Sequence, residues 1–546
     1  MITAFILAAL VAIICIVASK VSQRFGVSAL LIFIFIGMAF GSEGIVGLNF
    51  SDYQLTELLC TIGLIVIMFY GGFGTSWKYA KKYATQAGIL SSLGTIFTAL
   101  LVTVAAHFLL GFEFAESFLL GAVISSTDAA SVFSILRSHK LNLKDGLAPL
   151  LEVESGSNDP FAYMLMIIGI TLLSAQVQAS QVAGLVASQI IFGVLFGVLV
   201  ALVTMFLFKH INFGSNGLDS IFILAVAFLA YALPSVVNGN GFLSVYIAGI
   251  IIGNSLIANK IELVHFFDGL TQLAQILIFF LFGLLVFPSR LPYTFIPALI
   301  TFLVMTFIAR PLIMTVLLKP FKRNFKEIAF VSAAGLRGAA SLVFAVTAIS
   351  TLSQEGSPIS FDLYHTVFWI VLFSIALQGS IIPYAAKFLK LVDDSESVMK
   401  TFNDYQEETD FNLIEMEVEE DGPYAGKYLK DVRLPGGALA VVIKRGDTSV
   451  IPQGSTLLKA GDTLVLNAQV KLTSAESIEL KELELVNKHP WINHTISDLD
   501  LLPHALIVYV KRNDETFIPD GNTRLYNGDT LVLSGEIPQN PQSVLR

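Results

Sequence analysis

The chain has 546 residues, of which 55% are hydrophobic and only 14% are charged, whereas soluble domains carry roughly 25% charged residues. This composition excludes an ordinary soluble enzyme and favours a polytopic membrane protein. The net charge of -9 is uneven, because residues 1–390 contain 19 Lys and Arg against 16 Asp and Glu, while the remainder contains 14 against 26. A membrane-spanning part is therefore followed by an acidic soluble part.

Apolar segments long enough to cross a membrane fill the first 390 residues. A helix needs about 20 residues to span the hydrocarbon core, and this length predicts thirteen spans. Their ranges are 2–18, 28–47, 57–75, 87–111, 115–136, 147–173, 181–208, 218–237, 241–257, 269–288, 293–318, 327–351 and 363–388. Both cysteines, Cys15 and Cys60, lie within spans, which argues against a disulfide framework or a cysteine metal site.

Cationic residues alternate between the two sides of these predicted spans. Every second connection carries Lys, Arg or His side chains, from Lys20 and Arg24 to Lys387 and Lys390, and the intervening connections are mostly acidic or uncharged. Cytoplasmic loops of membrane proteins are enriched in Lys and Arg. The alternation predicts that the N-terminus lies outside the cell membrane and that the tail is cytoplasmic; only Arg290 departs from the pattern.

Polar residues interrupt the fifth and sixth predicted spans. The run 125–128 (Ser-Ser-Thr-Asp) competes with helical hydrogen bonds and predicts a local break. In the sixth span, Glu154 and Asn158 share one helix face, as do Ser155 and Asp159. An ionisable side chain in the hydrocarbon region is costly and is expected to face a polar cavity or a partner. These residues therefore form the first candidate site.

This candidate site offers oxygen atoms of the kind that a partly dehydrated cation binds. We expect Asp159 with Ser155, and Asp128 or Thr127 from the predicted break, to supply them. Two other interpretations stay open. One is a proton relay without a metal ion, and the other is a structural role in which the polar groups only hold helices together. The presence of three carboxyl groups favours function over helix association.

Two arginines lie inside predicted spans, where a permanent charge needs a buried counter-ion. Arg310, in the eleventh span, is expected to pair with Glu154, which leaves Asp159 as the free carboxylate. Snorkelling of Arg310 to the cytoplasmic face is the alternative. Arg337, in the twelfth span, is flanked by glycines, and this sequence predicts a second helix break opposite the first.

The soluble tail begins with an acidic linker, predicted over residues 391–421, which holds twelve acidic residues. Two segments then repeat at a constant offset of 67 residues; for example, the sequence GDTLVL of residues 461–466 recurs at 528–533. A constant offset indicates an internal duplication, and Gly-Asp turns between short apolar runs predict strands. We assign the two units to residues 422–480 and 481–546.

The polar residues of the membrane part, in this order and spacing, resemble those of the monovalent cation/proton antiporters of the NhaP and NHE kind. The resemblance covers about residues 1–390 and rests on Thr127-Asp128, Glu154-Ser155, Asn158-Asp159, Arg310 and the sequence Leu-Arg-Gly-Ala at 336–339. It implies a polytopic α-helical membrane protein of about 13 transmembrane helices with inverted repeats. The fifth and twelfth helices would be broken and cross beside the ion site, and the protein would form a homodimer.

The same resemblance implies roles for individual residues. Asp159 would bind a cation or a proton in competition, and a single carboxylate that cannot hold both couples the two fluxes without ATP or covalent chemistry. Asn158 beside it would accompany electroneutral exchange. The remaining matches are Thr127, Asp128 and Ser155 to positions that line or coordinate the ion, Glu154 and Arg310 to a structural ion pair, and Arg337 to a residue that sets the local electrostatics.

The duplicated tail resembles the C-terminal regulatory domain of potassium-conductance and Trk-type proteins, written RCK-C or TrkA-C, here as a tandem pair of small β-rich domains. This resemblance implies regulation by a small ligand, such as a nucleotide or cyclic dinucleotide, or dimerisation through the tail. An assembly module that binds nothing small is the alternative. No resident cofactor is expected. The expected partners are the transported cation and proton, membrane lipid and a second copy of the chain, with no nucleic acid.

The leading hypothesis is a secondary antiporter that exchanges a monovalent cation for H⁺ across a bacterial inner membrane, with roles in potassium efflux or pH homeostasis. Potassium is favoured over sodium only because the tail resembles domains of potassium systems. A gated cation channel with a regulatory tail is the alternative. It is disfavoured because the sequence contains no selectivity-filter motif such as TVGYG. No nucleophile, zinc or nucleotide motif supports an enzyme.

Overall fold

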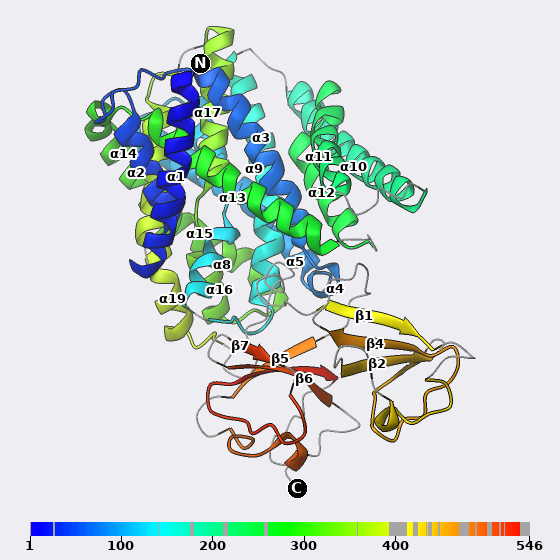
Figure 1. The fold of residues 1–546 in the computed structure, drawn as a ribbon. Coiled ribbons are helices and arrows are strands. Elements are labelled where there is room, and N and C mark those ends of the chain that lie inside the picture. Colours follow the sequence, from blue (N-terminus) through cyan, green and yellow to red (C-terminus); the bar gives the residue numbers. More distant parts are fainter. Residues whose placement is uncertain are drawn as a thin grey trace. The chain divides into compact units, whose positions relative to one another are not determined.

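The computed structural model forms two compact units, one over about residues 1–393 and the other over most of the remainder. We call them the membrane unit and the tail unit and describe each by itself (Figure 1). The described residues are 2–25, 28–139, 141–174, 179–210, 217–255, 260–357, 359–392, 412–418, 424–432, 434, 439–445, 448–468, 480–485, 489–499, 505–512, 515–517 and 519–535.

The membrane unit consists almost entirely of helices. Its α-helices are α1 (Ile2–Phe25), α2 (Ala29–Phe40), α3 (Tyr53–Gly74), α4 (Trp77–Ala80), α5 (Ala84–Ile89), α6 (Thr95–Ala105), α7 (Phe114–Val123), α8 (Ala129–Ser138), α9 (Leu147–Ser174), α10 (Ala179–His210), α11 (Leu218–Val236), α12 (Gly241–Gly253), α13 (Lys260–Leu284), α14 (Leu291–Val304), α15 (Arg310–Leu318), α16 (Phe325–Ala333), α17 (Ala339–Glu355), α18 (Leu363–Phe373) and α19 (Gly379–Phe388). Single π-helical turns extend or join them at η1 (Leu90–Gly94), η2 (Ala106–Leu110), η4 (Met305–Ala309) and η6 (Ser374–Gln378).

Each of the thirteen predicted spans overlaps one of these helices or a joined or broken pair. Among the described residues, seven helices are long and apolar enough to cross a membrane, and five shorter apolar helices accompany them. The tenth predicted span, 269–288, begins too late, because α13 already starts at Lys260. Asp268 lies inside this helix, where its carboxylate accepts a hydrogen bond of 2.8 Å from Gln272 one turn further on. A polar residue that is satisfied within its own helix does not mark a helix end.

Glycines allow α3 and α12 to pack with their backbones in direct contact. A Cβ atom at Gly249 would lie only 2.6 Å from the Phe69 carbonyl oxygen, and one at Gly253 would meet the Phe73 carbonyl. Any larger residue would force the two helices apart. Helices α13 and α17 also pack on α3, which places α3 at the centre of the membrane unit.

Helix α10 presents an apolar outer face. Ile191, Leu195, Leu199 and Phe206 are all exposed, although an exposed row of large apolar side chains is unfavourable in water. The same row is favourable against lipid hydrocarbon. The surface of this helix therefore agrees with its high mean hydropathy of 2.9 and with a position in a membrane.

The tail unit contains two antiparallel sheets of the same design. The strands of the first are β1 (Asn412–Glu417), β2 (Leu439–Arg445), β3 (Thr448–Val450) and β4 (Thr463–Ala468), in the order β1-β4-β2-β3. Those of the second are β5 (Leu480–Glu484), β6 (Ala505–Arg512), β7 (Glu515–Phe517) and β8 (Thr530–Gly535), in the order β5-β8-β6-β7. The repeated strand order confirms the predicted duplication.

Strand β1 lies within the segment that the amino-acid composition predicts to be an acidic linker. Its residues Ile414 and Met416 pair with Leu466 and Leu464 of β4, and Met416 packs against the first apolar core of the tail. Apolar and acidic residues alternate here, so one face of the strand is apolar although the segment carries a high charge. The first domain therefore begins at or before Asn412, and residues 393–411 of the predicted linker lie outside the described residues.

A β-bulge occurs at the same place in both repeats. The register shifts at Val441 in β2 and at Val508 in β6, and these two positions are related by the 67-residue offset. A bulge turns a side chain out of the regular alternation. Val441 and Val508 are fully buried in one small cluster with Tyr509 and Val532, so the two bulges build the contact between the two domains of the tail.

An arginine–aspartate pair is also repeated in the tail. Arg445 donates two hydrogen bonds of 2.7 Å from Nε and Nη2 to the buried carboxylate of Asp462, and Arg512 binds Asp529 in the same way. The hydrogen bond from Arg445 holds the pKa of Asp462 below its ordinary value. A carboxyl group with a lowered native pKa stabilises the fold above its unfolded pKa of about 3.9, and this contribution is lost as the pH falls through the native pKa.

We expect the Arg445→Met variant to weaken the first tail domain by about 2 kcal/mol at pH 7, because a buried carboxylate loses two charge-assisted hydrogen bonds. Limited proteolysis of the detergent-purified full chain measures this as faster cleavage of the tail. The difference in cleavage rate between the variant and the unmodified protein should shrink as the pH is lowered below about 4. Lys427→Met, which removes an exposed cation from the same domain, is the control, and equal cleavage of both variants would contradict the prediction.

Candidate functional site

Two helices of the membrane unit are broken, and their breaks meet. The first break separates α7 from α8, and the second separates α16 from α17. The Asp128 amide donates a hydrogen bond of 2.8 Å to the Leu336 carbonyl oxygen. Arg337 donates from Nη1 to the carbonyl oxygens of Ser125 (2.7 Å) and Ser126 (2.5 Å). Carbonyls that lose their helical donors at a break are thus satisfied by a fully buried guanidinium.

Two residues of η6 support the second break. The Arg337 amide donates a hydrogen bond of 2.9 Å to the Ser374 hydroxyl, and the Gln378 amide group donates one of 2.8 Å to the Ala333 carbonyl oxygen. Without these partners, the backbone groups of the break would be buried and unpaired. These hydrogen bonds from η6 therefore stabilise the second break.

Two residues of α9 clamp the first break. The Asn158 side chain donates a hydrogen bond of 2.5 Å to Thr127 Oγ1 and accepts one of 3.3 Å from the Thr127 amide. The Ser155 hydroxyl donates to the Thr127 carbonyl oxygen (2.7 Å) and accepts from the Ala129 amide (2.8 Å). Both side chains replace hydrogen bonds that a continuous helix would have made, and they fix the break to α9.

Asp128 caps the helix that follows the break. Its carboxylate accepts hydrogen bonds from the Ser131 amide (3.1 Å) and hydroxyl (2.6 Å), which is the arrangement expected of an N-cap residue. A Cβ atom at Gly338 would collide with the Asp128 carboxyl group. The two breaks therefore fit together only because the second one has a glycine at this position.

We expect Gly338→Ala to reduce the cation–proton exchange that the sequence predicts by at least about tenfold while the protein still folds, because a displaced carboxyl group disturbs the geometry of both breaks. Flux in liposomes measures the first effect, and size-exclusion chromatography in detergent measures the second. Gly94→Ala is the matched control, since a Cβ atom there makes only an ordinary contact of 3.5 Å with Met314. Full activity of the Gly338→Ala protein would refute this account of the breaks.

Asp159 occupies a different environment from the other carboxylates of the site. Its Oδ1 accepts a hydrogen bond from the Ser126 hydroxyl, and the side chain belongs to no ion pair within the part of the chain that the structure describes. The residue is only partly buried. A carboxylate beside hydroxyl and carbonyl oxygens, without a fixed cation, is a set of ligands suited to a hard cation.

Glu154 and Arg310, the pair expected from the sequence, lie in contact. Arg310 Nη2 is 2.7 Å from Glu154 Oε1, and the two side chains are 4% and 1% exposed. Such burial is incompatible with snorkelling of Arg310 to an aqueous face. The pair connects α9 to α15. Asp159 and Asp128 are then the carboxylates of this group without a basic partner among the described residues, and Asp128 is already bound by Ser131.

Four residues of the site were not assigned a role from the sequence: Ser126, Ser131, Ser374 and Gln378. Ser126 lies in the predicted break, but the sequence does not show which of its hydroxyls meets Asp159. Ser131 follows the break by three residues, which is the spacing of an N-cap bond. Ser374 and Gln378 are polar residues inside an apolar span, and this contrast was the available signal.

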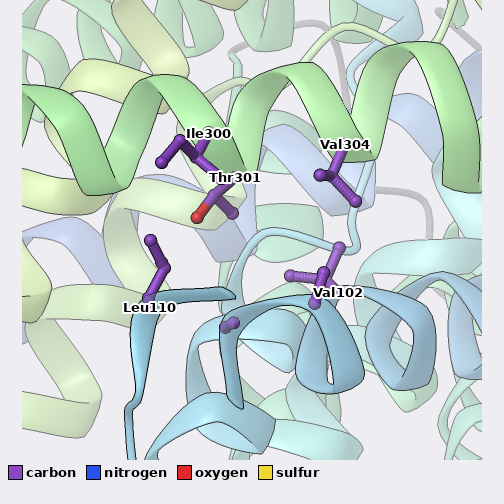
Figure 2. A pocket seen from close by; sticks show the side chains of 7 residues that line it. Val102, Leu110, Ile300, Thr301 and Val304 are labelled. Carbon is purple, nitrogen blue, oxygen red and sulfur yellow. The ribbon is translucent and has the colours of Figure 1, made fainter. Parts of the chain in front are cut away.

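An apolar hollow lies elsewhere in the membrane unit, between α6 with η2 and α14. Figure 2 shows its lining, which includes Val102, Leu110, Ile300, Thr301 and Val304. Its lining holds no ionisable side chain and it has no room for a water-sized sphere. The site of interest is thus not this hollow. It is the junction of the two breaks with α9, an arrangement typical of secondary transporters, whose ion sites lie at discontinuous helices.

Comparison with known proteins identifies the family. The transmembrane domain of the sodium/hydrogen exchangers matches residues 6–387, and the TrkA-C domain matches twice, at residues 413–471 and 480–539. The chain belongs to the sodium/hydrogen exchanger family and carries two C-terminal TrkA-C domains. Both resemblances found in the sequence are thereby confirmed.

Named relatives cover most of the chain. The K(+)/H(+) antiporter NhaP of Alkalimonas amylolytica is 32% identical over 459 residues, which are 83% of this chain and 79% of that protein. The K(+)/H(+) antiporter NhaP2 of Shewanella sp. (strain ANA-3) is 31% identical over 512 residues, or 91% and 88%. Among solved structures, the sodium proton antiporter MjNhaP1 from Methanocaldococcus jannaschii has a similar fold, with a TM-score of 0.63, 23% identity and coverage of 69% of this chain and 99% of that chain.

Proposed function

We propose that this protein is a secondary antiporter that exchanges K⁺ for H⁺ across a bacterial cell membrane. The observation that carries the proposal is the position of Asp159, a carboxylate bound by Ser126 of the first helix break, with no basic partner among the described residues. The names of the relatives, K(+)/H(+) antiporters at 31–32% identity over most of the chain, support K⁺ as the cation. Na⁺ is the competing choice, and the oxygen ligands at the site suit either ion.

The mechanism follows from competition at one group. Asp159 binds either a proton or a cation, and the same site is presented to the two sides of the membrane in turn. Thr127, Ser155 and Asp128 line the site from the break and from α9, while Asn158 holds the break in place. Arg337 donates hydrogen bonds to the carbonyl oxygens of the first break, and the ion pair of Glu154 with Arg310 holds α9 against α15. The two ion gradients set the direction of exchange.

The arrangement in the membrane is part of this proposal. Thirteen spans, built as inverted repeats with the two broken helices crossing, put the N-terminus outside and the tail in the cytoplasm, as the alternation of cationic loops indicates. Two copies form the working unit. The TrkA-C domains regulate transport by binding a small ligand, for which a nucleotide or cyclic dinucleotide is the candidate. The match of both domains supports a regulatory tail.

Ion flux in proteoliposomes tests the proposal directly. The purified protein is reconstituted with a pH-sensitive dye inside, a proton gradient is imposed, and K⁺ and Na⁺ are titrated separately. Saturable proton movement that depends on K⁺ supports the proposal, and movement with Na⁺ alone would reassign the cation. A gated channel, the alternative, would give an electrical conductance that is not coupled to protons. Conductance without coupled exchange would therefore refute antiport.

A further inference from the structure

Tyr246 of α12 is a buried tyrosine beside the candidate site that the mechanism above does not use. The residue is 3% exposed. Its hydroxyl forms no hydrogen bond of normal geometry within the described residues, although the Ser157 and Thr75 side chains are near it. A buried hydroxyl without a partner costs about 1–3 kcal/mol. Such a group needs an explanation, and a bound ion is one that the position of Tyr246 makes testable.

The position of Tyr246 along α9 is defined by two contacts. A Cβ atom at Gly156 would lie 2.7 Å from the Tyr246 hydroxyl oxygen, so this hydroxyl lies against the α9 backbone. Further along, the Tyr163 ring packs on Phe242 of α12 with 5.0 Å between the ring centroids. Gly156, Asp159 and Tyr163 follow one another at the spacing of a single helix face. Asp159 therefore lies between the two levels at which α12 touches α9.

A second oxygen is available at the same level. Pro160 lies inside α9, and a proline has no N–H group to donate to the carbonyl four residues earlier. The carbonyl oxygen of Gly156 consequently lacks its usual helical partner. The turn that begins at Gly156 and ends at Pro160 thus carries a carbonyl oxygen without this donor, the Asp159 carboxylate and, from α12, the Tyr246 hydroxyl.

Helix α12, which contains Tyr246, packs directly against the backbone of α3. A Cβ atom at Gly72 of α3 would lie 2.5 Å from the backbone carbonyl oxygen of Tyr246, so this part of α12 is fixed directly to the centre of the membrane unit. A ligand atom on a rigid element is presented with a defined geometry, and such geometry favours selection between ions. Tyr246 therefore lies against the turn of α9 that begins at Gly156, on a helix that is neither of the two broken ones.

We propose that the Tyr246 hydroxyl is a further cation-facing oxygen of the transport site, which acts with the Gly156 carbonyl and Asp159 and determines cation affinity and selectivity. The inference rests on the proposed antiport at Asp159. The phenol oxygen replaces part of the hydration shell of a monovalent cation, as hydroxyl and carbonyl oxygens do in other ion sites. When a proton occupies Asp159, the hydroxyl has no cation to bind.

The test is the Tyr246→Phe variant, which removes one oxygen atom and keeps the ring. We expect the concentration of K⁺ that gives half-maximal exchange to rise by at least about tenfold, which is the effect of losing one favourable contact to a charge. The ratio of K⁺ to Na⁺ affinity should change as well, and the rate at saturating K⁺ should be retained. Thermal stabilisation of the detergent-purified protein by K⁺ should need a correspondingly higher concentration, and this readout does not depend on transport.

Tyr364→Phe is the matched control, because Tyr364 is also buried but its hydroxyl donates to the Phe282 carbonyl oxygen instead of facing the site. This control should leave K⁺ affinity unchanged. Unaltered K⁺ affinity and selectivity in Tyr246→Phe would overturn the inference. The proposed antiport is tested separately, because it requires that Asp159→Asn lose exchange. If Tyr246→Phe does not fold, Gly156→Ala, whose methyl group pushes against the same hydroxyl, must lower K⁺ affinity, and unchanged affinity in that protein would refute the inference equally.

Discussion

Replacement of Asp159 by Asn is expected to reduce cation–proton exchange to the leak rate of protein-free liposomes. Asparagine has nearly the same shape, and its carbonyl oxygen still accepts the hydrogen bond that the Ser126 hydroxyl donates to Asp159. It has no negative charge for a cation and takes up no proton in the physiological range. Both ligands are lost together, so the flux of each ion should disappear in proteoliposomes.

The fold should survive this change, because placing a neutral amide in a partly buried position costs less than placing a charge there. The melting temperature of the variant in detergent should equal or exceed that of the unmodified protein. Asp268→Asn is the control, since the Asp268 carboxylate is bound by Gln272 within its own helix, and this variant should transport normally. Undiminished exchange by the Asp159→Asn protein would show that another group carries the coupled ions.

Loss of the Arg310 charge is expected to destabilise the membrane unit strongly. Arg310→Met leaves Glu154 as a buried carboxylate without a partner, and breaking a buried pair in this way costs about 3–5 kcal/mol. Both side chains are almost fully buried, at 4% and 1% exposure. We therefore expect a much lower yield of monodisperse protein and a lower melting temperature, both measured by size-exclusion chromatography after a heat step.

A double variant separates the structural effect from a role in transport. When Glu154→Gln is combined with Arg310→Met, no charge is left unpaired, and much of the stability should return because the desolvation cost of both ions also disappears. Exchange activity in the restored protein would assign the pair a purely structural role. A single Arg310→Met variant with the yield and melting temperature of the unmodified protein would refute the importance of this ion pair.

Much of the site could be predicted because membrane-embedded charges are rare enough to be informative. The run 125–128 and the glycines around Arg337 indicated helix breaks, and the structure has breaks at both places. The pairing of Glu154 with Arg310 followed from the need of each charge for a partner, and the two are in contact. The duplication of the tail followed from one constant offset, and its strand order repeats.

The details that escaped prediction are contacts between distant parts of the chain. Arg337 binds the carbonyl of Ser126, which lies 211 residues away, and no local pattern shows which carbonyl a guanidinium will meet. In the sequence, Tyr246 is one more aromatic residue in an apolar helix. Its importance is visible only when its level along α9 is known. Strand β1 was missed for another reason. The high charge of its segment concealed the alternation of apolar and acidic residues, and the strand that pairs with it begins only at Thr463.

The two bulged valines of the tail have a consequence for how such a protein evolves. Val441 and Val508 occupy equivalent places in two copies of one ancestral domain, and they meet in the same apolar cluster. In an assembly of identical chains, every substitution at such a contact appears on both sides at once. Here the two sides are encoded separately, so either half can acquire a new surface while the other preserves the contact. Because the domain is duplicated within one chain, the two sides of this contact can change independently of each other.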